Sequence, residues 1–158
     1  MPSQRIETAK KFIGQFATFD SKTLEEVISD DFYQEFAPAS IDPPMGPFDK
    51  TAMLEQGNKL SALFSGFVMT AKEYIDSAEE NKVTVWTTGK AIFRDDVKDD
   101  GLTPEEWDFR GEYIFLLTFN EAGKIKKVVE FLDSQSTAAK LHPLIKRAVG
   151  NKQKAAAK

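Results

Sequence analysis

Apolar residues recur every three or four positions in three segments of the first 64 residues, a spacing typical of helices that pack on a core. The pattern predicts helices over residues 3–19, 21–32 and 49–64. Ser3 and Asp49 stand at the starts of the first and third segments, where short polar side chains serve as N-caps. The N-terminal part of the chain is therefore predicted to be mainly helical.

Beyond residue 66 the apolar positions alternate with polar ones, which is the period of a strand with one buried face. Residues 67–76 and 82–93 form one predicted hairpin, and residues 107–119 and 124–134 form another. The second pair is joined by Asn-Glu-Ala-Gly, a four-residue turn in which Gly123 takes the left-handed position. The pattern thus predicts four long antiparallel strands.

The remaining elements complete an α+β domain over residues 1–149. A shorter strand over 32–40 falls between the second and third helices, and a last helix over 137–149 is kinked or restarted at Pro143. Helices and strands that are segregated along the chain predict helices on one face of a curved antiparallel sheet. Residues 150–158 are predicted to be a frayed or disordered lysine tail.

The charge and composition limit the classes of molecule that the protein is expected to bind. The 158 residues carry a net charge of −4, so no nucleic-acid partner is expected, because phosphate binding needs clustered Lys and Arg. We find no signal sequence and no apolar stretch of membrane-spanning length, and we expect a cytoplasmic protein without a membrane partner. With no cysteine and only His142 as histidine, no metal site is predicted. Thirteen phenylalanines favour an aromatic core or an apolar cavity.

Two segments are similar to the NTF2-like superfamily. They are PPMGPFDKTAML at residues 43–54 and GEYIFLLTFNEAGKIKKVVEFLDS at residues 111–134. With the order of helices and strands, they most resemble the SnoaL-like proteins common in fungi, over the chain up to Val149. The superfamily includes ketosteroid isomerase, scytalone dehydratase and polyketide cyclases. The resemblance implies a cone-shaped fold around a small-molecule pocket and chemistry that needs no cofactor, although one fold hosts many chemistries.

The register of the second hairpin decides which side chains meet on its inner face. A four-residue turn pairs Phe119 with Lys124 and places Tyr113 opposite Glu130, whereas a three-residue turn with a bulge would shift the pairing by one. In ketosteroid isomerases an aspartate of the oxyanion hole points into the cavity, and the resemblance places Phe115 at that position. The resemblance therefore implies that Tyr113 and Glu130 face the pocket.

Glu130 and Tyr113 are the predicted catalytic residues. Apolar walls raise the pKa of a carboxyl group toward neutral pH, and a tyrosine hydroxyl can donate a hydrogen bond to a developing oxyanion. The alternative is a structural contact between the two side chains across the strands, without catalysis.

Apolar side chains are predicted to line the pocket. By resemblance, the tyrosine and the catalytic base of ketosteroid isomerases fall at Phe16 and at Phe36 or Ala37, so that reaction is excluded. The cavity suits an apolar ligand such as a polyketide or terpenoid. Its predicted walls are Phe16, Phe36, Met53, Trp86, Phe109, Phe115, Val128 and Leu132. Alternatively, the phenylalanines fill the cone and leave no pocket.

The opposite face of the same hairpin is also apolar. It carries Ile114, Leu116, Val129 and Phe131, with Arg110 opposite Asp133 at one end as a predicted ion pair. An exposed apolar strip is covered most simply by a second copy of the chain, so a homodimer through the back of the sheet is predicted. Two functions remain open. One is a cofactor-free isomerase, cyclase or dehydratase of secondary metabolism, and the other is a non-catalytic dimeric binding or scaffold protein.

Overall fold

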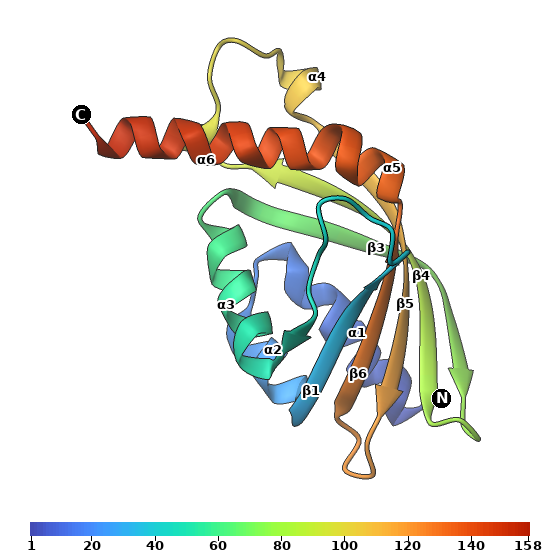
Figure 1. Ribbon diagram of the computed structural model, residues 1–158. Coiled ribbons are helices and arrows are strands. Elements are labelled where there is room, and N and C mark those ends of the chain that lie inside the picture. The colour runs from blue at the N-terminus through green and yellow to red at the C-terminus, as the bar shows by residue number, and fades with distance from the viewer.

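The computed structural model describes all 158 residues and shows a curved six-stranded sheet with helices gathered over its concave face (Figure 1). The helices are α1 (Gln4–Gly14), α2 (Ser21–Val27), α3 (Lys50–Ser61), α4 (Pro104–Trp107), α5 (Ser134–Ser136) and α6 (His142–Ala156), with the short turns η1 (Gln15–Ala17), η2 (Asp95–Val97) and η3 (Thr137–Leu141). The strands are β1 (Ile28–Ala37), β2 (Phe48–Asp49), β3 (Phe64–Ser77), β4 (Lys82–Phe93), β5 (Phe109–Phe119) and β6 (Ile125–Leu132). The predicted α+β architecture is confirmed.

The strands of the sheet follow the order β2-β1-β6-β5-β4-β3. Neighbouring strands are antiparallel except β1 and β6, which run parallel. The predicted fully antiparallel sheet is wrong at this one pairing. Turn and hairpin patterns report on strands that are adjacent in sequence, whereas β1 meets β6 only after the chain has passed through α3 and three long strands.

Both predicted N-caps are present. The Ser3 hydroxyl accepts a hydrogen bond from the Ile6 amide at 3.2 Å, and the Asp49 carboxylate accepts one from the Ala52 amide at 2.8 Å. The first helix is shorter than predicted, because the chain tightens into η1 after Gly14. The apolar spacing continues through this turn. The spacing therefore predicts the buried face of the segment more accurately than it predicts the residue at which the helix ends.

The β5–β6 hairpin keeps its predicted faces but has a different register. Phe115 lies opposite Glu130 and Tyr113 lies opposite Leu132, with an irregularity at Thr118–Phe119. The predicted pairing of Tyr113 with Glu130 is therefore wrong by two positions. Asn120, and not Phe119, lies across the turn from Lys124, and the strand bulges once beside the turn. A shift of two residues leaves every side chain on its own face of the sheet. Glu130 consequently points to the same side as Phe115.

The predicted ion pair between Arg110 and Asp133 does not form. Arg110 Nε donates to the Asp108 carboxylate at 3.4 Å, while the Asp133 carboxylate accepts a hydrogen bond from the Ser136 amide at 3.1 Å. The shifted register carries Asp133 beyond the last pair of the ladder, where it becomes the N-cap of α5.

The C-terminal helical segment crosses one end of the sheet (Figure 1). Pro143 lies in the first turn of α6, directly after the π-helical turn η3, where the α-helical hydrogen-bond pattern is already interrupted. Residues 150–156, predicted to be a frayed tail, continue α6 in the structure. Asn151 is held there by hydrogen bonds to Val97 and Asp99, and the Lys, Gln and Ala residues that follow are strong helix formers. The Asp99 carboxylate accepts hydrogen bonds from Arg147 Nε at 2.8 Å and Asn151 Nδ2 at 2.6 Å, which ties the loop between η2 and α4 to α6.

Candidate functional site

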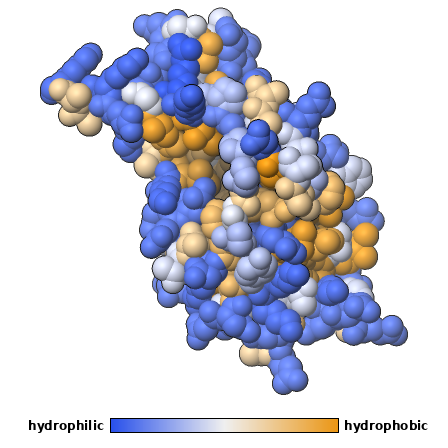
Figure 2. Space-filling view, viewed as in Figure 1, coloured by the Kyte–Doolittle hydropathy of each residue, from blue (hydrophilic) through white to orange (hydrophobic).

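A cavity of about 460 Å³ lies between the concave face of the sheet, α3 and the C-terminal helical segment. Of its 25 lining residues 15 are hydrophobic, so the walls suit a mainly apolar molecule. Figure 2 shows apolar surface gathered in the hollow between α6 and the helices below it. The alternative of a cone filled entirely by phenylalanine is therefore not what the structure shows.

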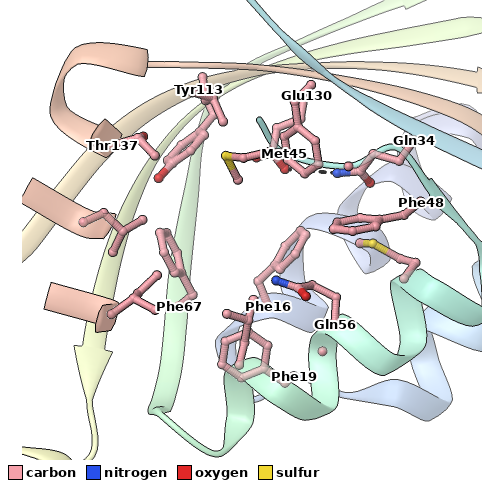
Figure 3. Close-up of a pocket in the computed structure, with 18 of the residues that line it drawn as sticks. Phe16, Phe19, Gln34, Met45, Phe48, Gln56, Phe67, Tyr113, Glu130 and Thr137 are labelled. Atoms are coloured by element: carbon pink, nitrogen blue, oxygen red, sulfur yellow. Dashed lines mark hydrogen bonds between the residues drawn. The ribbon is translucent and has the colours of Figure 1, made fainter. Parts of the chain in front are cut away.

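Six of the ten residues predicted for the site line this cavity: Phe16, Phe36, Met53, Tyr113, Glu130 and Leu132. They come from five elements, η1, β1, α3, β5 and β6, which the fold brings around one space. The close-up in Figure 3 shows several of these side chains facing the same opening.

The other four predicted residues do not line it. Phe109, Phe115 and Val128 are at most 1% exposed and belong to the packed core. Phe115, for example, is covered by the rings of Phe12 at 6.0 Å and Phe16 at 6.1 Å. Alternation along a strand identifies a face of the sheet but not the part of that face that a helix covers.

Trp86 is on the wrong side of the sheet for a ligand contact in the cavity. Its side chain is 39% exposed on the convex face, where Nε1 donates to the Glu112 carboxylate at 2.9 Å and Lys72 Nζ lies 4.5 Å from the ring centroid. Its neighbours Val85 and Thr87 are fully buried, as the strand period requires.

Glu130 is a carboxyl group held in an apolar wall. Its residue is only 9% exposed, and the one side chain that donates to it is Gln34, through Nε2 at a long 3.4 Å. Burial raises the pKa of Glu130 from 4.5 to about 8, and the hydrogen bond from Gln34 offsets only part of this effect. The group therefore binds and releases a proton near neutral pH.

Tyr113 lies flat over two glycines that face each other across β4 and β5. A Cβ atom at Gly111 would lie 2.6 Å from the Tyr113 hydroxyl oxygen, and one at Gly89 would lie 2.9 Å from its ring. The ring also meets Phe67 edge-on at 6.1 Å. Burial, followed by the charges of Glu130 and Asp133, raises the pKa of Tyr113, so its hydroxyl remains a donor.

The absence of a side chain at Gly111 is therefore needed for the position of Tyr113. We expect Gly111→Ala to displace the hydroxyl and to lower the stability by about 1–3 kcal/mol, the usual cost of overpacking. Thermal unfolding and the NMR signals of the Tyr113 ring measure the two effects. Gly150→Ala is the matched control, because a Cβ atom there meets nothing within 4 Å. Unchanged Tyr113 signals in Gly111→Ala would contradict this account.

Glu130 and Tyr113 are not in direct contact. Because Tyr113 pairs with Leu132, the two residues are diagonal neighbours on one face of the hairpin, about 7–8 Å apart at Cα. In Figure 3 the Tyr113 hydroxyl points toward Thr137, whereas the Glu130 carboxyl lies beside Gln34. The Tyr113 hydroxyl and the Glu130 carboxyl therefore face different parts of the cavity.

Five further polar residues line the cavity and were not predicted from the sequence as residues of the site. They are Gln15, Gln34, Gln56, Thr137 and His142. The inward position of Gln34 could have been predicted, since it alternates with Phe32 and Phe36 on the inner face of β1. Thr137 and His142 had none, because only the tertiary path of the C-terminal segment brings them to the cavity. Burial lowers the pKa of His142, so its imidazole is neutral near pH 7.

The structure contains no group of three or more His, Cys, Asp or Glu side chains placed to hold a metal ion. None of the helices has both the length and the apolar character that a membrane crossing requires.

The chain has the NTF2-like fold, as the sequence predicted. It is similar to BvnE pinacolase from Penicillium brevicompactum, with a TM-score of 0.71 and 21% identity over 98% of this chain and 97% of that chain. It is also similar to AusH from Aspergillus nidulans, with a TM-score of 0.67 and 24% identity over 85% of this chain and 88% of that chain. PrhC from Penicillium brasilianum NBRC 6234 has a TM-score of 0.73 and 11% identity over 94% and 90% of the two chains.

No protein-family model matches the sequence, and no curated protein matches it either. The similarity to solved structures at these identities establishes the fold. The chemistry has to be argued from the cavity itself.

Proposed function

We propose that this protein binds an apolar, polyketide- or terpenoid-like small molecule and isomerises, cyclises or dehydrates it by proton transfer without a cofactor. The observation that carries the proposal is the Glu130 carboxyl, 9% exposed in a mainly apolar cavity of about 460 Å³. A buried carboxyl without a cationic partner destabilises the fold once it is charged, which favours a role in chemistry over one in structure.

Proton transfer is the reaction that this geometry supports. As a carboxylate, Glu130 takes a proton from a carbon next to a carbonyl group, and the electron pair of the broken C–H bond moves onto the carbonyl oxygen. The Tyr113 hydroxyl, which faces another part of the cavity, is suited to hydrogen-bond a second oxygen of the substrate and so to orient it for the proton transfer. Return of the proton to another carbon isomerises the substrate. Loss of a neighbouring hydroxyl group, or attack of the new enolate on a second group, completes a dehydration or a cyclisation.

The structural neighbours support an enzyme over a scaffold. BvnE is a pinacolase, and another neighbour is an LEH-like epoxide hydrolase from M. tuberculosis. These names describe those proteins, but they place enzymes on this fold.

Hydrogen–deuterium exchange on 2-tetralone tests the proposal without knowledge of the natural substrate. This compact apolar ketone carries exchangeable protons beside its carbonyl group. We expect the protein to accelerate their exchange in D₂O, with a rate that rises with pH up to about 8 as Glu130 loses its proton. NMR follows the loss of the proton signals. Exchange no faster than in buffer at every pH would overturn the proposal.

We also propose that two copies pair through the convex face of the sheet. Ile114, Leu116 and Phe131 are 41%, 41% and 50% exposed there, and Trp86 adds a further exposed ring. Ile114 is the direct strand neighbour of both Trp86 and Phe131, so the patch is continuous across three strands. Continuous exposed apolar patches of this kind are typical of interaction surfaces.

A charge within this patch is expected to separate the copies. Leu116→Asp would bury an unpaired carboxylate in the dimer, so sedimentation velocity should show a monomer where the unmodified protein is a dimer. Val149→Asp is the control, since Val149 is similarly exposed, at 38%, but lies on α6. A monomer before any substitution, or a dimer that survives Leu116→Asp, would contradict the proposed interface.

A further inference from the structure

We infer that the ligand of this cavity carries two separate oxygen functions on an apolar skeleton, a hydroxyl group at Glu130 and Gln34 and a carbonyl or hydroxyl group at Tyr113 and Thr137. The inference rests on the proposed function for the identity of the cavity, and it adds the class of substrate.

The first observation is where the unsatisfied polar atoms of the protein lie. Four buried side-chain atoms have no hydrogen-bond partner: Gln15 Nε2, Gln34 Oε1, Thr137 Oγ1 and His142 Nδ1. All four residues line the cavity described above. Gln15, Gln34 and Thr137 are 5%, 1% and 1% exposed, so bulk water does not satisfy them. A buried polar group without a partner destabilises a fold, and four around the same cavity indicate a ligand that completes them.

The first polar group combines Gln34 of β1 with Glu130 of β6. Gln34 donates to the carboxyl group through Nε2 and leaves its Oε1 atom free. An amide oxygen only accepts hydrogen bonds, so the ligand atom that completes it carries a proton. A hydroxyl or enol group beside Glu130 meets this requirement.

The second polar group is assembled by the π-helical turn η3. The His142 amide donates to the Thr137 carbonyl, a bond between residues five apart. In an α-helix, with 3.6 residues per turn, residues five apart point about 140° away from each other. The wider turn instead lets Thr137 and His142 both line the cavity. Figure 3 shows the Tyr113 hydroxyl directed toward Thr137, which adds a donor to the same group.

The walls between the two groups are apolar. Figure 3 shows Met45 between Tyr113 and Glu130, with Phe67 and Phe16 on the opposite side of the opening. A ligand that reaches both groups must therefore cross an apolar space. Its oxygens must stand at separate positions, which excludes a plain hydrocarbon and a molecule that is polar throughout.

Four bicyclic probes of nearly equal size test the inference. Tetralin has no oxygen, 1-tetralone has the carbonyl group, 5,6,7,8-tetrahydro-2-naphthol has the hydroxyl group, and 6-hydroxy-1-tetralone has both. Calorimetric titration at pH 6, where Glu130 is protonated, gives each Kd. We expect each oxygen to tighten binding about tenfold, so that the compound with both binds about 100-fold more tightly than tetralin.

Two substitutions test which polar group of the cavity produces each gain in affinity. Thr137→Val keeps the shape and removes one of the two hydroxyl groups at this end, so 1-tetralone should lose part of its gain over tetralin, and the remainder should come from Tyr113. Gln34→Leu should reduce the gain of the naphthol in the same way. Thr137→Val should also leave the thermal stability unchanged or raise it, because it removes an unpartnered hydroxyl. Glu121→Gln, in the exposed β5–β6 turn, is the control and should change none of these affinities.

The outcomes separate this inference from the proposed function. If tetralin and its derivatives all fail to bind, the apolar pocket and the proposed function are both wrong. If the four probes bind equally, the pocket stands and the inference of two oxygen functions is overturned. A loss of stability in Thr137→Val would also overturn it, because Thr137 would then have a structural partner.

Discussion

Glu130→Gln is expected to slow the exchange of the 2-tetralone protons by roughly 10²- to 10⁴-fold, the usual contribution of a general acid–base group. The amide keeps the size and shape of the carboxyl group but cannot take a proton at neutral pH. The side chain is only 9% exposed and its sole side-chain hydrogen bond is the 3.4 Å contact from Gln34, so the substitution leaves the packing intact. NMR in D₂O at pH 8 measures the rate for both proteins.

Glu121→Gln is the matched control for this experiment. Glu121 is exposed in the turn between β5 and β6, so its replacement should leave the exchange rate unchanged. An exchange rate in Glu130→Gln within a factor of two of the unmodified protein would show that Glu130 is not the base. In that case the catalytic proposal fails while the fold and the pocket remain.

The second large effect is on the pH dependence of stability. In the folded protein the pKa of Glu130 is about 8, against an ordinary value of 4.5. Between these two values the folded state binds more protons at this site than the unfolded state, so stability falls as the pH rises. The loss is about 1.4 kcal/mol for each pH unit across the window, and it levels off above the folded pKa. Denaturant unfolding from pH 4.5 to 9 measures this slope.

Glu130→Gln should abolish this slope and leave the variant more stable than the unmodified protein above pH 8. His142 works in the opposite direction, because its lowered pKa favours the neutral imidazole in the folded state. Its contribution is common to both proteins and cancels in their difference. Identical pH profiles for Glu130→Gln and the unmodified protein would contradict the buried, partner-poor environment of Glu130.

Taken together, the two measurements distinguish a functional carboxyl group from a structural one. A structural glutamate contributes to stability, and its removal weakens the fold. Glu130 is expected to do the reverse at alkaline pH while its removal stops proton transfer. A group that lowers stability in exchange for reactivity is characteristic of active sites.

Local patterns in the sequence determined most of the elements and the face on which each side chain lies. Ser3 and Asp49 cap the helices that they were predicted to cap, and Gly123 has a positive φ of 79° in its turn. The strand period placed Glu130 and Tyr113 on one common face, and the resemblance to the NTF2-like proteins identified it as the inner one. The register error of two positions left that placement unchanged. Caps, turns and alternation depend on residues that are close in sequence, so one chain is enough to read them.

The tertiary structure alone decided which inward side chains meet the cavity. Phe115 and Phe109 have the same parity as Tyr113, yet they are fully packed, because helices cover that part of the sheet. The shorter turn and the bulge at Thr118–Phe119 together moved Glu130 away from Tyr113. These outcomes depend on contacts between distant segments, which no local period records.

The polar residues that line the cavity show most clearly which features local sequence predicts and which depend on the tertiary structure. Gln15, Gln34, Thr137 and His142 come from η1, β1, η3 and α6, and nothing in their local sequence links them. The parallel pairing of β1 with β6 sets Gln34 beside Glu130, and the π-helical turn carries Thr137 and His142 to the other end of the cavity. The sequence by itself determined an α+β cone with an inward carboxyl group. Only the packing of segments more than 90 residues apart, such as Gln34 and Glu130, decided which polar groups share the cavity.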